Sequence, residues 1–280
     1  MRYAICNETF EGWEHPRVCD FIAGLGYSGL ELAPFTLAPL ITDVSAGMRR
    51  KLRFAAEHAG VTIVGLHWLL AKTTGFQLTS PDADVRKRTG DYIGELARAA
   101  ADMGGDILVL GSPAQRKIPD GCSYRQAEDY AVLCLEGVLP VLDKTGVKLC
   151  LEPLTAKETD FMITAADAVR IIGRLGHPNV KLHLDAKAMA AEAEPRAAII
   201  AANARHTYHF HANDENLRGP GFGAVDFKPI LNALHDTNYG GWVSVEVFDY
   251  SPDPETIARE SIRYLKECEI LAPPLRNGEG

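Results

Sequence analysis

A regular alternation of short apolar runs with longer segments of helical periodicity constrains this chain more than any other feature of its sequence. Eight runs rich in β-branched residues and leucine have the length and composition of strands: 3–7, 29–33, 62–67, 107–111, 147–152, 180–185, 206–211 and 242–247. Between them, apolar residues recur at intervals of three and four, which predicts helices over 48–60, 86–105, 127–146, 165–176, 226–238 and 253–268. Strands separated by helices pair in parallel through crossover connections.

Eight strand and helix units of this kind predict an α/β protein with a (β/α)8 TIM barrel in a single domain. The length of 280 residues suits such a barrel, for which about 250 is typical. An open doubly wound sheet is the competing fold, but CNETFEGW follows the first strand in place of the glycine-rich phosphate turn of that fold. We expect one catalytic domain over 1–272 and an unstructured tail over 273–280.

Charge and composition exclude several classes of protein. The formal net charge is −8 with acidic and basic residues interspersed, so no basic stripe is present that would bind a nucleic acid. No segment approaches about 18 unbroken apolar residues, and the first residues lack a secretory pattern. We therefore expect a cytoplasmic protein with no membrane partner. The six cysteines are scattered without a C-x-x-C pair, which indicates reduced thiols.

The candidate functional residues stand where the predicted strands end. In a barrel of this type the working side chains lie at the C-terminal ends of the strands and in the loops that follow. Polar or aromatic residues expected there are Glu31, His67, Trp68, Glu152, His183, Asp185, His209, His211 and Glu246. Residues two positions apart in a strand share a face, so His183 lies with Asp185 and His209 with His211. Glu31 is either a substrate contact or part of a salt bridge in the barrel mouth.

The last four strands each present one metal-ligating group at the same height: Glu152, Asp185, His211 and Glu246. Three carboxylates so close together would repel one another unless a cation lay among them. We therefore expect one divalent metal ion, Mn²⁺ first, with Mg²⁺, Co²⁺ or Zn²⁺ as alternatives. His209 would lie lower in the barrel. The competing interpretation is a polar barrel mouth whose groups satisfy one another through hydrogen bonds.

The same residues bear a resemblance to a known family. The matching segments are LCLEPL (149–154), KLHLD (181–185), HFHANDENLRGPGFGAVDF (209–227) and YGGWVSVEVF (239–248). They resemble the xylose isomerase-like TIM-barrel superfamily, in particular its sugar isomerases and ketose 3-epimerases of the D-tagatose 3-epimerase group. The resemblance extends over all eight units, and it implies that the four residues named above bind the metal ion. It further implies that Glu158 and Arg218 contact substrate hydroxyls.

One position departs from the pattern of that family. A histidine that contacts the substrate typically stands three residues after the metal-binding aspartate, but here Ala188 occupies that position. This departure puts the usual free ketose substrate in doubt. Lys187 stands beside the gap and is a further candidate for substrate binding.

The reaction that such a site would support begins with a carbonyl and a neighbouring hydroxyl of a sugar on one metal ion. The ion would stabilise the cis-enediolate that forms when a carbon-bound proton leaves. Glu152 and Glu246 are the candidate catalytic residues, because one can remove a proton and the other can return one to the opposite face. His67 and Trp68 are expected to line the substrate pocket, or else to pack beneath the third loop.

Two other functions start from the same residues. A leaving group next to the enediolate would turn the enzyme into a metal-dependent dehydratase or lyase acting on a keto-sugar or keto-glycoside. A barrel that binds a sugar without turning it over is a further alternative. In each case the expected partner is a small-molecule sugar, and related barrels imply a homodimer or homotetramer.

Overall fold

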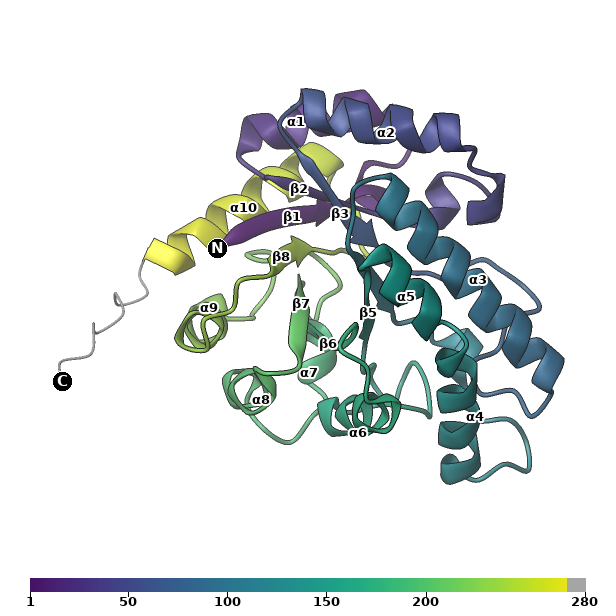
Figure 1. The fold of residues 1–280 in the computed structure, drawn as a ribbon. Coiled ribbons are helices and arrows are strands. Elements are labelled where there is room, and N and C mark those ends of the chain that lie inside the picture. The colour runs from purple at the N-terminus through teal and green to yellow at the C-terminus, as the bar shows by residue number, and fades with distance from the viewer. Residues whose placement is uncertain (271–280) are drawn as a thin grey trace, which may run out of the picture.

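The computed structural model describes residues 1–270, which form a closed barrel of parallel strands in the order β1 to β8 (Figure 1). The strands are β1 (Arg2–Cys6), β2 (Gly29–Leu32), β3 (Thr62–Leu66), β4 (Ile107–Leu110), β5 (Lys148–Leu151), β6 (Val180–Asp185), β7 (Thr207–Ala212) and β8 (Trp242–Val245). Pairing of β1 with both β2 and β8 closes the barrel. The prediction of a single-domain (β/α)8 barrel is confirmed; the expected tail over 273–280 lies outside the described residues.

Helices connect the strands and surround the barrel in Figure 1. They are α1 (His15–Leu25), α2 (Ala46–His58), α3 (Ala83–Asp102), α4 (Tyr124–Glu136), α5 (Leu139–Thr145), α6 (Ala165–Leu175), α7 (Ala186–Met189), α8 (Arg196–Asn203), α9 (Phe227–Asp236) and α10 (Pro254–Ile270). The sequence pattern missed α1, although Pro16 opens it and Gly26, with φ of 90°, ends it. The single helix expected over 127–146 is two helices, because the chain breaks at Gly137 and restarts with Pro140 in the first turn of α5.

Several helices begin with a side-chain cap that follows a barrel strand. Ser45, Asp82, Ser123, Thr164 and Asp226 each accept a hydrogen bond from a backbone N–H in the first turn of the next helix. Each such cap stabilises its helix by about 1 kcal/mol. The caps lie on the same side of the barrel as the C-terminal ends of the strands, so they also restrain the loops that carry the candidate site.

The barrel interior changes character along its axis. Near the N-terminal ends of the strands it is filled by a small apolar cluster of Ala4, Val64, Ile107, Val109, Cys150 and Trp242. Above this floor the inward positions are polar and fully buried, and include Glu31, His183 and His209. The main apolar core lies in the layer between strands and helices. A buried polar layer over an apolar floor is therefore what positions the candidate site.

Two observations concern membrane-spanning helices and the state of the cysteines. Within 1–270, no helix is both long enough and apolar enough to cross a membrane. All six cysteines carry free thiols. Burial raises the pKa of the Cys6 thiol to about 11, so this residue, at the end of β1, stays protonated and is a poor nucleophile.

Candidate active site

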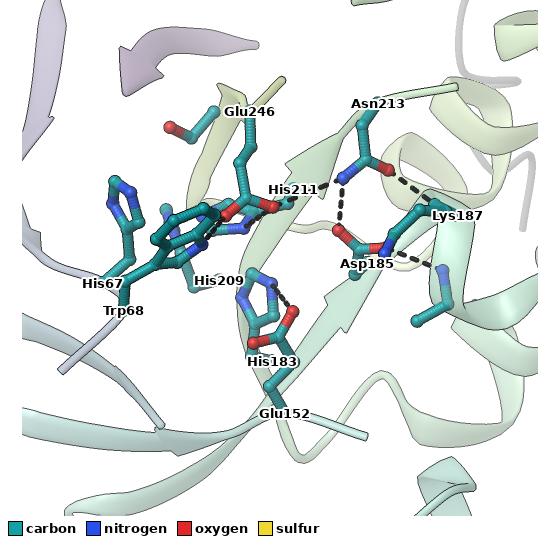
Figure 2. A network of polar contacts seen from close by, with 12 residues as sticks. His67, Trp68, Glu152, His183, Asp185, Lys187, His209, His211, Asn213 and Glu246 are labelled. Carbon is teal, nitrogen blue, oxygen red and sulfur yellow. Dashed lines mark hydrogen bonds and ion pairs between the residues drawn. The ribbon is translucent and has the colours of Figure 1, made fainter. Parts of the chain in front are cut away.

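The ends of β5, β6 and β7 bring three of the predicted metal ligands together. Asp185 and His211 are paired residues of neighbouring strands, and Glu152 follows β5 directly. Together with His183, these side chains offer ligand atoms that all lie within 4.8 Å of one another (Figure 2). Gly111 makes room for this arrangement, because a Cβ atom there would overlap the Glu152 carboxylate.

Glu246, directly after β8, completes the predicted set. Its Oε2 lies 3.2 Å from Nδ1 of His211, and its Oε1 accepts a hydrogen bond of 2.7 Å from the indole N–H of Trp68. Figure 2 shows the Trp68 ring lying directly against this carboxylate. The four predicted ligands are almost completely buried, with exposed fractions between 1% and 6%: His211, Asp185, Glu246 and Glu152.

Two residues that the sequence analysis did not propose as ligands also belong to this cluster. The amide of Asn213 donates to Asp185 and, at 3.4 Å, to Glu246, while its Oδ1 accepts from the backbone N–H of Lys187 at 2.9 Å. Nε2 of His183 lies 3.7 Å from Glu152. The alternation of strand faces could have predicted both residues. Asn213 follows His211 by two residues and His183 precedes Asp185 by two, so each shares a face with a predicted ligand.

The buried carboxylates of this cluster shift one another's pKa values. Burial, together with the nearby Glu246 and Asp185, raises the pKa of Glu152 to about 8. Burial and Glu246 likewise raise the pKa of Asp185. Burial also opposes the charge of Glu246, but His211 outweighs it and lowers the pKa of that carboxyl below its usual value. Ionising all three acids at neutral pH therefore needs additional positive charge.

A second polar network lies on the other side of His211. Oε2 of the fully buried Glu31 is 2.8 Å from Nε2 of His209 and 3.1 Å from Nε2 of His211. Burial opposes the charge of Glu31, but these two histidines outweigh it and hold the pKa of Glu31 well below its usual range. Glu31 is thus an ion-pair partner of the histidines, which is one of the two alternatives that the sequence left open.

The donor set fits a divalent cation. Glu152, Asp185, His211 and Glu246 supply carboxylate oxygens and one imidazole nitrogen, a combination that suits Mn²⁺ and related ions. The Nδ1 atom of His211 faces Glu246, while Nε2 is held by Glu31. A metal-binding histidine is commonly held in this way by a carboxylate at its second nitrogen.

The predicted substrate contacts lie above and beside this cluster. Lys187 donates to Glu158 at 2.8 Å and lies 4.4 Å from the ring centre of Phe248. Trp68 lies between Phe35 and Phe248, with ring centres 5.6 and 5.8 Å away. Ala188 is buried, and its backbone N–H donates to Asp185 at 2.7 Å.

Two predicted contacts have other partners in the structure. His67 is fully buried, with Nε2 3.0 Å from Glu8 and Nδ1 3.7 Å from Glu31. Arg218 is half-buried and donates to Asp249 at 3.0 Å.

The loop after β4 holds a buried cation. Arg116 is 1% exposed, and its guanidinium donates to the backbone oxygen of Glu152 at 2.6 Å. Burial lowers the pKa of Arg116 to about 10, so it remains charged at neutral pH. Arg116 therefore holds the chain in place at the end of β5.

Comparison with known proteins places this geometry among sugar-converting barrels. Residues 19–268 match the family model described as xylose isomerase-like TIM barrel. A D-psicose 3-epimerase of Ruminiclostridium cellulolyticum is 27% identical over 88% of this chain and 82% of its own length. A fructoselysine 3-epimerase of Escherichia coli O157:H7 is 25% identical over 85% of this chain and 87% of its own.

Solved structures agree on the fold. The apo form of an E. coli 3-keto-D-glucoside 4-epimerase superposes with a TM-score of 0.83 at 21% identity, over 96% of this chain and all of its own. Because the match spans 96% of this chain, the barrel architecture is common to both proteins.

Proposed function

Because the chain belongs to the xylose isomerase-like TIM barrel family, and its relatives are carbohydrate epimerases, we propose that it is a divalent-metal-dependent sugar epimerase or isomerase. The expectation of an enzyme acting on carbohydrate agrees with these relatives. The proposed substrate is a ketose or keto-sugar. The observation that supports it best is the buried cluster of Glu152, Asp185 and His211, against which Glu246 lies.

In this proposal Glu152, Asp185, His211 and Glu246 hold one divalent ion, most suitably Mn²⁺, with Mg²⁺, Co²⁺ or Zn²⁺ as substitutes. The bound ion supplies Lewis-acid stabilisation of the cis-enediolate of the sugar, an effect of several kcal/mol. The four side chains exclude water from the reacting carbons because they are almost fully buried.

Glu246 and Glu152 would move the proton. His211 keeps Glu246 ionised by lowering its pKa, so this carboxylate is available to accept a proton. Glu152 is then the group that returns one. They extend from β8 and β5, so one can act on each face of the carbon. That arrangement gives epimerisation, whereas one base serving two carbons gives isomerisation.

The remaining predicted contacts would orient the sugar. Lys187 and Glu158 form an ion pair whose donor and acceptor can bind adjacent hydroxyls. Trp68 offers an aromatic face beside Glu246. Arg218, whose side chain is half-buried, would contact the sugar from the outside. His67 is the most deeply buried of the proposed contacts.

A lyase that eliminates a substituent from the same enediolate is the second candidate. The observation that favours it is Ala188, which leaves one side of the site without the hydrogen-bonding side chain expected from the resemblance.

The test is incubation of the Mn²⁺-loaded protein with ketoses and 3-keto-glycosides in deuterated water. Label at one carbon with retained mass supports the epimerase, and loss of water or aglycone supports the lyase. The Glu152→Gln and Glu246→Gln variants should lose label exchange. Glu57→Gln, on the exposed face of α2, is the matched control. Absence of exchange with every sugar and every ion would overturn the proposal.

A further inference from the structure

A cavity lies beside the proposed metal cluster, on the same face of the barrel. Its volume is about 540 Å³, and loops after β1, β2, β3 and β8 line it. Its walls include Glu11, Trp13, Glu14, Phe35, Trp68 and Tyr250. None of the four proposed metal ligands lines it, so it is a separate compartment. Its size lies within the range of about 300–1,000 Å³ that is usual for small-molecule sites.

Trp68 and Glu8 connect this cavity to the chemistry. Both line the cavity, while Trp68 donates to Glu246 and Glu8 lies near His67 and Glu246. Tyr250 lines the same cavity. A ligand extending past Trp68 would therefore have one end at the metal cluster and the other in the cavity.

The lining has the chemistry of a sugar site. Phe35 and Trp68 form one aromatic wall, and Trp13, which packs on Phe10 and Phe21, forms another. Aromatic walls with a few polar groups are typical of sites that bind partly apolar ligands.

Free carboxylates supply the polar groups of the cavity. Within residues 1–270, the carboxylates of Glu11 and Glu14 make no hydrogen bond and no ion pair, although both line the cavity. A carboxylate accepts hydrogen bonds only, so these side chains suit hydroxyl donors. The lining contains three glutamates, Glu8, Glu11 and Glu14, but Lys72 as its one lysine. This excess of negative charge disfavours an anionic ligand such as a phosphate.

We propose that this cavity binds the sugar substituent of a glycosylated keto-sugar whose keto ring lies at the metal cluster. The inference rests on the proposed function and names its substrate class: a keto-disaccharide rather than a free or phosphorylated ketose. Binding of the remote ring would help to orient the reacting ring, which Ala188 leaves with one contact fewer.

The experiment compares two substrates that differ only in the substituent. Label exchange is measured for a 3-keto-glucoside with a methyl aglycone and for one with a glucosyl aglycone. We expect kcat/KM to be at least about tenfold higher for the glucosyl compound. The Glu11→Gln/Glu14→Gln double variant should remove most of this ratio and change the methyl substrate by less than about twofold. Trp13→Ala should act in the same direction.

Folding controls keep the result interpretable. Trp13 contacts core aromatic residues, so its variant is compared by melting temperature. Glu11 and Glu14 are exposed and unpaired, so their double variant leaves the core intact. Calorimetric binding of both compounds to the Mn²⁺-loaded Glu152→Gln variant gives a second readout that does not need turnover.

The outcomes separate the two proposals. Equal kcat/KM for both compounds in the parent enzyme, or equal losses for both in the variants, would overturn the cavity assignment while leaving the epimerase intact. If no compound exchanges label, the proposed function fails. The calorimetry then decides the cavity, because an affinity for the glucosyl compound no higher than for the methyl compound rules it out.

Discussion

The two sides of the barrel mouth shift the pKa values of their buried carboxyl groups in opposite directions. On the acidic side, Glu152 after β5 and Asp185 in β6 have raised pKa values because they are buried and because carboxylates face one another there. The histidine side, made of Glu31, His67 and His209, has a carboxylate with a lowered pKa because imidazoles surround it. In the proposed function a divalent ion would neutralise the acidic side, whereas on the histidine side imidazoles stabilise the charge of Glu31.

His211 joins the two sides. Its Nδ1 faces Glu246 and its Nε2 faces Glu31, so one ring is held by a carboxylate of each kind. If the acidic side holds the proposed ion, Glu31 and His209 help to position His211 without being ligands themselves. Four experiments test this difference between the two sides.

The largest effect is expected from Glu152→Gln, which removes a proposed proton donor from the acidic side. General acid–base groups contribute about 10²–10⁴-fold, so kcat for label exchange should fall by that factor. The measurement is exchange from deuterated water under saturating Mn²⁺, with Glu57→Gln as control. A kcat within threefold of the parent value would mean that Glu152 does not move the proton.

The next effect concerns the histidine side and uses Glu31→Gln. The variant keeps the shape of the side chain but weakens its interaction with His211. Mutation of a residue that holds a metal-binding histidine typically lowers metal affinity by about 10–100-fold. Calorimetric titration with Mn²⁺ should show that loss. An unchanged dissociation constant would show that the two sides act independently.

A smaller effect is expected where Trp68 bridges the sides. Trp68→Phe removes the N–H that Glu246 accepts at 2.7 Å while keeping an aromatic ring between Phe35 and Phe248. A hydrogen bond to a charged group is worth about 1.5–3 kcal/mol, so kcat should fall by roughly tenfold or somewhat more. Trp68 also has φ of 51°, a left-handed conformation that costs about 1 kcal/mol or more. A loss confined to KM would instead assign Trp68 to substrate binding alone.

The smallest effect is the pH dependence of metal-free stability. The folded-state pKa of Glu152 is raised from 4.5 to about 8, so its contribution to stability is present below about 4.5 and is lost as the pH rises to 8. The melting temperature of metal-free protein should therefore fall by a few degrees over this window. Mn²⁺ should remove the fall, as should Glu152→Gln. A melting temperature that rises across the window without metal would contradict the pKa of Glu152.

The sequence predicted the acidic side better than the histidine side, for a local reason. Glu152, Asp185, His211 and Glu246 stand at the ends of strands whose apolar runs are unambiguous, so their common height follows from barrel geometry. Asn213 and His183 were within reach of the same alternation. Glu8 was not, because it lies in a 3-10 turn, η1 (Asn7–Phe10), where no periodicity places the side chain. Helices α1 and α8 were missed because short or mixed segments have weak periodicity.

The local sequence was enough to predict the barrel, the strand order, and the three acids and one imidazole at its rim, since alternation and strand ends are local properties of the chain. Which side chains contact these acids and this imidazole depends on the tertiary structure. Glu31 meets His209 and His211 across strands 178 and 180 residues apart in sequence, and Arg116 turns inward to brace Glu152. Such contacts depend on barrel closure and on loop burial, and no run of neighbouring residues encodes the distance between two side chains that meet only when the sheet closes.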